Sequence, residues 1–119
     1  MTRLVKPTIG DWRRLVDLGQ YLNGTKDLTF IIRPSNMCLI GSADASFASH
    51  LDRKGHSGGV LWFDGASAPI SALSKKQTLV ARSSTEAELV ALDLVAHDAV
   101  WMREILSEMG YTQREPTRI

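Results

Sequence analysis

The chain has 119 residues, of which 44% are hydrophobic and 23% charged, and its formal net charge is +1. This balance is typical of one small soluble domain with a packed core, and it excludes a positive field over the whole surface. The lone Cys38 excludes an internal disulfide and a thiolate zinc cluster, and its apolar neighbours predict a buried thiol. Because no apolar run is long enough to span a bilayer and residues 1–7 lack the core of a signal peptide, we expect a soluble, intracellular protein without membrane contact.

The first part of the chain has apolar residues at helical spacing. They begin at Trp12, after acceptable cap residues at Thr8 and Asp11, and end before Asn23-Gly24, a helix-stop signal. The spacing predicts an amphipathic helix at about 9–23. A run rich in β-formers follows and predicts a strand at about 28–33.

Further strands are predicted at about 37–47, 57–63 and 69–74. The turn residues between them include Asp64-Gly65, a strong hairpin pair. These strands are expected to pair antiparallel, and residues 117–119 are expected to begin another strand.

The longest predicted element is a helix at about 84–109. Ser83 and Glu86 fit a capping box, in which Ser83 caps the helix and Glu86 reaches back to the cap amide. Apolar residues then recur at spacings of three and four, from Leu92 to Met109, and predict one buried stripe. The fold class is therefore α+β.

Two carboxylates stand out from this pattern. Extending the helical stripe back by four residues reaches Glu88, and an unpaired buried carboxylate needs a cation, a hydrogen-bond network or a metal. Asp44 lies among small residues on the most buried-looking strand. Two such oxygen ligands suit Mg²⁺ or Mn²⁺. The alternative is ordinary: a turn or surface ion pair for Asp44 and a helix-dipole role for Glu88.

Several motifs resemble, in order, the ribonuclease H region of copia-type retrotransposon Pol polyproteins. Ser42–Ala48 resembles the first-strand motif Ser-Asp-Ala-Asp-Trp-Ala, and Ser83–Leu89 matches Ser-Ser-Thr-Glu-Ala-Glu-Tyr almost residue for residue. Four further segments resemble motifs of the family. Residues 53–60 resemble Arg-Arg-Ser-Thr-Ser-Gly-Tyr, and residues 69–71 resemble Pro-Ile-Ser-Trp. Residues 74–77 resemble Ser-Lys-Lys-Gln, and residues 99–103 resemble Ala-Ile-Trp-Leu-Arg. The run 23–28 is similar to the one that precedes ribonuclease H in these polyproteins.

The resemblance implies a truncated ribonuclease H-like mixed sheet, with residues 28–119 as the N-terminal part of that domain. Residues 1–27 would be a connection, or tether, helix from the reverse-transcriptase domain of the same polyprotein. The implied activity is metal-dependent hydrolysis of the RNA strand of RNA–DNA hybrids during reverse transcription. Asp44 and Glu88 align with the family's catalytic metal ligands, which would bind Mg²⁺ or Mn²⁺; no other cofactor is implied.

Some features depart from the family pattern. Ser46 replaces the second Asp of the first-strand motif, and two later aspartates of the family are expected to lie beyond Ile119. The alternative function is therefore a truncated, non-catalytic remnant or interaction module. Basic residues that could contact a nucleic-acid backbone, or be ordinary solvated loop residues, are Arg53, Lys75, Lys76 and Arg82.

Overall fold

The computed structural model describes residues 6–119, which divide into two units between Phe30 and Ile31. Residues 1–5 lie outside this description. They include most of the segment 1–7, which lacks the core of a signal peptide, and the start of the expected 1–27 tether. In the first unit, α1 spans Ile9–Thr25, which confirms the predicted helix. A capping box begins it: Thr8 Oγ1 accepts from the Asp11 amide at 3.2 Å, and Asp11 Oδ2 accepts from the Thr8 amide at 3.0 Å.

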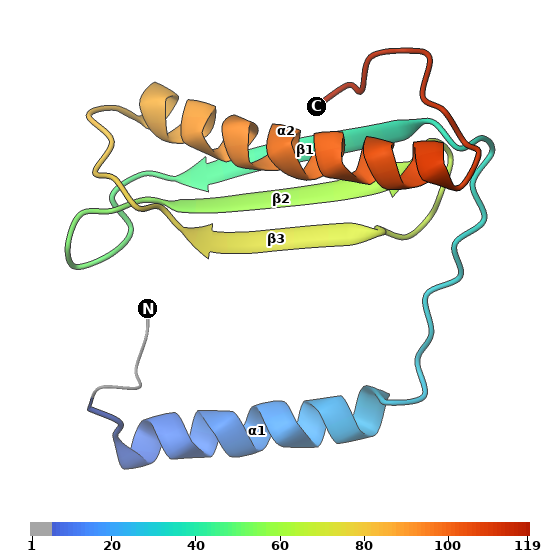
Figure 1. Cartoon of the computed structure of the whole chain (residues 1–119). Helices are drawn as coiled ribbons and strands as arrows, with labels where there is room; N and C mark the ends of the chain where they lie inside the picture. Colours follow the sequence, from blue (N-terminus) through green and yellow to red (C-terminus); the bar gives the residue numbers. More distant parts are fainter. Residues whose placement is uncertain (1–5) are drawn as a thin grey trace. The chain divides into compact units, whose positions relative to one another are not determined.

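The second unit contains an antiparallel sheet in the order β1-β2-β3, with α2 along one face (Figure 1). The strands are β1 (Leu39–Ser46), β2 (His56–Phe63) and β3 (Ser71–Lys76), and α2 spans Ser84–Glu108. The expected α+β class is confirmed. Asp64-Gly65 turns the chain after β2, with Gly65 at a φ of 72° that suits glycine.

Two strand predictions need correction. The predicted strand at 28–33 is not formed, although its residues have high β propensity. Leu28 and Phe30 are 77% and 79% exposed. Propensity reflects packing on a paired, half-buried surface, and this segment pairs with no strand among the described residues. The strand predicted at 69–74 lies two residues later, at 71–76, because the ladder with β2 runs from Ser71 opposite Leu61 to Lys76 opposite His56.

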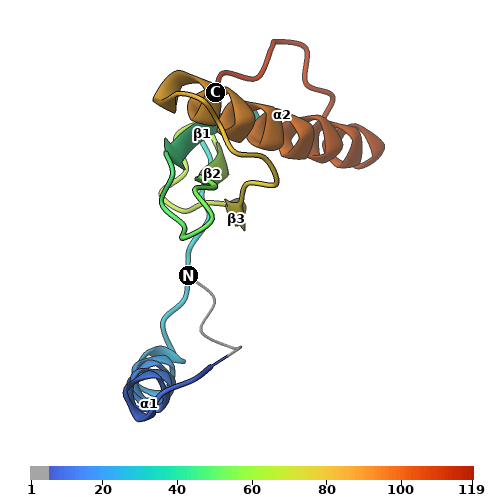
Figure 2. The same cartoon turned by 90° about the vertical axis from the view of Figure 1, so that its left-hand side faces the viewer.

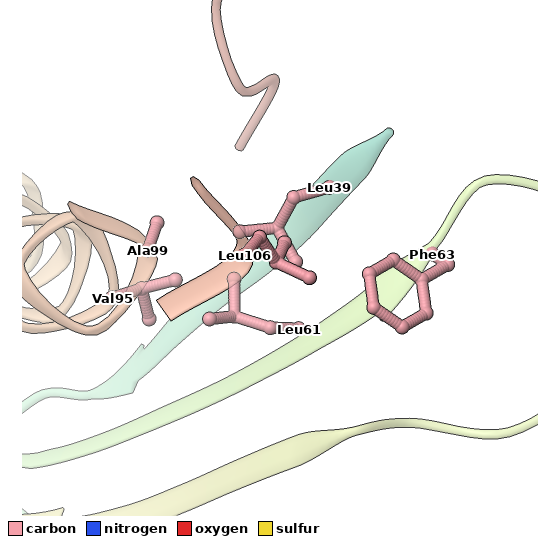
Figure 3. Close-up of a cluster of buried hydrophobic side chains, with 6 residues drawn as sticks. All are labelled: Leu39, Leu61, Phe63, Val95, Ala99 and Leu106. Carbon is pink, nitrogen blue, oxygen red and sulfur yellow. The ribbon is translucent and has the colours of Figure 1, made fainter. Parts of the chain in front are cut away.

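The core lies between α2 and the neighbouring strands β1 and β2, and Figure 2 shows α2 on one side of the sheet. Figure 3 shows the side chains that meet there: Leu39, Leu61, Phe63, Val95, Ala99 and Leu106. The predicted stripe is therefore correct from Val95 to Leu106. It is wrong at its ends, since Leu92 is 40% and Met109 64% exposed.

Alanines decide which side of α2 is buried at its N-terminal end. Ala87 and Ala91 are 1% and 0% exposed, directly before the buried Val95. Gly59 of β2 faces Val95 so closely that a Cβ at this position would clash with it. The helix and the sheet thus approach closely through small side chains, and the larger Leu92 is turned toward solvent.

The end of the chain returns to β1. The guanidinium of Arg103 donates to the Gln113 and Glu115 carbonyls at 2.7 and 2.8 Å. Arg118 then forms a parallel bridge with Ile40, and its carbonyl accepts from the Gly41 amide at 2.8 Å. Arg118 thus pairs with β1 through a single parallel bridge, within the segment that was expected to begin another strand, while the sheet of β1, β2 and β3 is antiparallel.

Cys38, predicted to be buried, is exposed just before β1 begins. Among residues 6–119, α1 and α2 are the helices, and neither combines the length and the apolar character that crossing a membrane would require.

Candidate functional site

Glu88 lies in the second turn of α2, beside β1. It lines a cavity of about 290 Å³ together with Ser42 and Ala43 of β1 and the side chain of Leu92. The residue is exposed, so the expectation that it heads the buried stripe is wrong. The buried side of the helix instead begins with Ala87 and Ala91, which directly precede Glu88 and Leu92 in the sequence.

Asp44 is an exposed residue near the C-terminal end of β1, opposite Gly58 of β2. Its neighbour Ala43 packs against the core and lies opposite Gly59, which faces α2. Since successive side chains of a strand alternate between the two faces, the Asp44 side chain points to the face of the sheet away from α2. It does not line the cavity that Glu88 lines.

The structure brings the two carboxylates to the same end of the sheet. Glu88 stands beside Ser42 and Ala43, directly before Asp44 in β1. In the part of the chain that the structure describes, neither carboxylate has a hydrogen bond or an ion pair, and no group of three or more His, Cys, Asp or Glu residues could hold a metal. The site is thus a pair of free carboxylates on elements that pack together.

Glu86 has a separate, structural role. Ser83 Oγ accepts from the Glu86 amide at 3.1 Å, which confirms the predicted N-cap. The Glu86 carboxylate accepts from the Arg82 amide at 2.6 Å instead of from the Ser83 amide. The capping contact is therefore displaced by one residue, and Glu86 remains engaged with the start of α2.

The predicted basic contacts are exposed but do not form one cluster of free cations. Lys76 Nζ lies 2.8 Å from Asp52 Oδ2. Lys75 lines a separate cavity of about 180 Å³ together with Asp93 and His97. Arg82 lies directly before α2, and Arg53 adopts a φ of 58° in the loop between β1 and β2.

His50 and His56 lie side by side. His50 Nε2 is 3.1 Å from His56 Nδ1, and His56 Nε2 is 2.8 Å from Ser74 Oγ. Spacing in the sequence does not reveal this group, because the loop before β2 and the pairing of β2 with β3 bring the three residues together.

Comparison with known proteins identifies relatives of the chain. It is 34% identical over 113 residues to the retrovirus-related Pol polyprotein from transposon TNT 1-94 of Nicotiana tabacum, and 33% identical over 111 residues to that from transposon RE2 of Arabidopsis thaliana. These matches cover 94% and 92% of this chain but only 8% of each polyprotein.

A third relative is shorter. The secreted RxLR effector protein 161 of Plasmopara viticola is 34% identical over 93 residues, which make up 76% of this chain and 64% of the effector. No family model matches the chain, and no solved structure matches it. The similarity to the transposon proteins spans both units of the chain, so the protein belongs to the copia-type, retrovirus-related Pol polyproteins and corresponds to a short part of them.

Proposed function

We propose that this chain is a ribonuclease H-like segment of a copia-type Pol polyprotein and that it contributes to cleavage of the RNA strand of RNA–DNA hybrids. The observation that carries the proposal is the position of Asp44 and Glu88, two carboxylates without partners among the described residues, at one end of the sheet. Both align with the metal ligands of the family that the motifs resemble. The fold, an antiparallel sheet with a parallel bridge at Ile40, is consistent with a truncated ribonuclease H-like fold.

The donor set suits a hard divalent cation. Mg²⁺ is commonly held by one or two carboxylates, with water and substrate phosphate oxygens as its remaining ligands. Asp44 and Glu88 lie on opposite faces of the sheet at this end, so each would offer one carboxylate to a cation, and both are exposed to solvent. When bound, Mg²⁺ or Mn²⁺ would neutralise developing charge on the phosphate and activate the attacking water.

The chain's own residues would hold and orient the substrate. Lys75, Arg82 and Arg53 are exposed cations that would contact phosphates without reading sequence. An RNA–DNA hybrid would be recognised by its shape and its 2′-hydroxyl groups. The reverse-transcriptase domain of the same polyprotein is the proposed partner in this reaction.

Cleavage of a labelled RNA–DNA hybrid in the presence of Mn²⁺ tests the proposal. Asp44→Asn and Glu88→Gln are each expected to reduce cleavage to the level measured without metal. Glu104→Gln, which changes an exposed carboxylate elsewhere on α2, should retain it. Paramagnetic broadening of the Asp44 and Glu88 amide signals by Mn²⁺ measures binding independently of activity. The absence of both cleavage and broadening would contradict the proposal.

A second candidate function is an interaction module, and the outer edge of β1 favours it. Gly41 directs its amide to Arg118 at this edge. Because backbone groups alternate in direction along a strand, the amides and carbonyls of Ala43 and Ala45 also point to this outer edge. Within residues 31–119, no strand pairs with Ala43 or Ala45 at the outer edge. An open edge can pair with another chain. The shorter relative shows that a related segment also makes up most of a protein named as a secreted effector.

Sedimentation tests this second candidate. Association of the full chain should increase with concentration and should weaken in Ala45→Pro, because proline cannot donate a hydrogen bond at the edge. A chain that stays monomeric at all concentrations would count against self-association through β1.

A further inference from the structure

The histidine pair is distinct from the carboxylates proposed for catalysis, although His56 lies opposite Ser46, two residues after Asp44 in β1. His56 is the first residue of β2, and His50 belongs to the loop that connects β1 to β2. Their ring centroids are 5.3 Å apart, with the ring planes at 37° to each other. The short contact joins His50 Nε2 to His56 Nδ1 at 3.1 Å, so one nitrogen of each ring points at the other ring.

The backbone holds this arrangement on both sides. The His50 amide donates to the Lys54 carbonyl at 3.2 Å, and the Arg53 amide donates to the His50 carbonyl at 2.9 Å. His56 is fixed in the ladder between Ser46 and Lys76. The two rings are therefore presented by a turn closed by hydrogen bonds and by a paired strand.

We propose that His50 and His56 form a two-imidazole site for Zn²⁺ or a similar late transition-metal ion. Zn–N bonds of about 2.0–2.1 Å at a tetrahedral angle place two ligand nitrogens about 3.3–3.4 Å apart. The observed 3.1 Å separation differs from this by a few tenths of an ångström, within a small rotation of either ring. Imidazole favours Zn²⁺, Cu²⁺ and Ni²⁺, whereas Mg²⁺ and Mn²⁺ favour the oxygen ligands of the carboxylate site.

Ser74 completes the arrangement around His56. Its hydroxyl oxygen lies 2.8 Å from His56 Nε2. In the tautomer that binds a metal through Nδ1, Nε2 carries the proton and donates it to this oxygen, as metal-ligating histidines usually do to a neighbouring acceptor. The serine thereby orients the ring and directs the free electron pair of Nδ1 toward His50.

Lys76 and Asp52 are charged residues close to His50. Desolvation and the nearby Lys76 ammonium lower the pKa of His50 below its ordinary value of 6.5; His56 acts in the same direction and Asp52 opposes it. Asp52 itself is held by Lys76 at 2.8 Å, so water molecules would complete the coordination of the ion.

Zinc titration of the metal-free full chain tests the site, with competition against a chromophoric chelator as the readout. A single equivalent should bind, and excess Mg²⁺ should not displace it. His50→Gln and His56→Gln should each weaken binding by about tenfold or more. His97→Gln is the matched control, because His97 lies on α2 and contacts the Asp93 carbonyl; it should bind zinc as the unmodified chain does.

Imidazole NMR signals of the unmodified chain provide a measurement that does not depend on the variants folding. Zn²⁺ should shift the ring signals of His50 and His56 and leave those of His97 in place. An ordinary N–H···N hydrogen bond between the rings would also explain the short contact. That explanation prevails, and the proposal fails, if zinc leaves the signals of His50 and His56 unchanged or if neither glutamine variant weakens binding.

Discussion

Gly59 of β2 and Val95 of α2 lie in direct contact, and a Cβ on Gly59 would overlap Val95 Cγ2. Val95 is fully buried, and the helix turns on either side of it present alanines to the sheet. This contact sets how closely α2 approaches β2. It thereby sets which residues of the helix are buried and where Glu88 stands relative to β1.

Gly59→Ala should destabilise the fold. The added methyl group must displace Val95 or move the helix, and overpacking of this kind costs about 1–3 kcal/mol. Urea unfolding measures the loss. Gly58→Ala is the matched control, because a Cβ at Gly58 would meet only the Asp44 and Leu73 carbonyls at 3.9 and 4.0 Å. Equal unfolding midpoints for both variants would show that the close contact does not limit packing.

Gln77→Met should also destabilise the fold. Gln77 is 4% exposed, and its Nε2 donates to Ser57 Oγ at 3.0 Å and to the Ala87 carbonyl at 2.9 Å. Methionine has a similar volume but leaves both buried acceptors without this donor, at a cost of about 1–3 kcal/mol. Thermal unfolding followed by circular dichroism measures the effect. Thr78→Ala, at the exposed neighbouring position, should leave the melting temperature almost unchanged.

Stability should fall as the pH is lowered through the titration of His50. Its pKa is lower in the folded chain than the ordinary 6.5, through desolvation and the charge of Lys76. Below about pH 6.5 the unfolded chain therefore binds more protons than the folded chain, and protonation favours unfolding. The stabilising contribution is present above this pH and is lost as the pH falls toward the folded pKa.

Urea unfolding of the unmodified chain and of His50→Gln at several pH values measures this contribution. The difference in unfolding free energy between them should change between about pH 7.5 and pH 5.5, where histidine titrates. A difference that is independent of pH in this window would show that His50 does not titrate differently on folding. The pKa of Asp52 is lowered from its ordinary value of 3.8, chiefly by the hydrogen bond from Lys76. Asp52 in the folded chain therefore titrates at a pH below 3.8, outside the range in which histidine titrates.

Arg103→Lys should loosen the end of the chain without unfolding the sheet. The guanidinium holds the carbonyls of Gln113 and Glu115 and the hydroxyl of Thr117 at 2.7–3.0 Å. Lysine cannot reproduce this forked set of donors. Hydrogen exchange of the Gly41 amide, which donates to Arg118, should accelerate, while exchange in the β1–β2 ladder stays slow. Arg114→Lys, an exposed neighbour, should not change it.

The elements that depend on local chemistry were predictable from the sequence. Thr8 and Ser83 begin the two helices as N-caps, and Asp64-Gly65 turns the chain after β2, because capping and turn geometry involve residues only a few positions apart. The catalytic roles of Asp44 and Glu88 came from motif resemblance and remain predictions.

Only the tertiary structure decided what depends on partners distant in the sequence. The segment 28–33 has the residues of a strand but no strand to pair with, and the buried side of α2 is set by the glycine of β2 that it meets. The face on which Asp44 leaves β1 follows from pairing with β2, and the contact of His50 with His56 follows from the turn and the ladder. Burial and side-chain proximity are properties of packed surfaces, whereas spacing along the chain describes one element at a time.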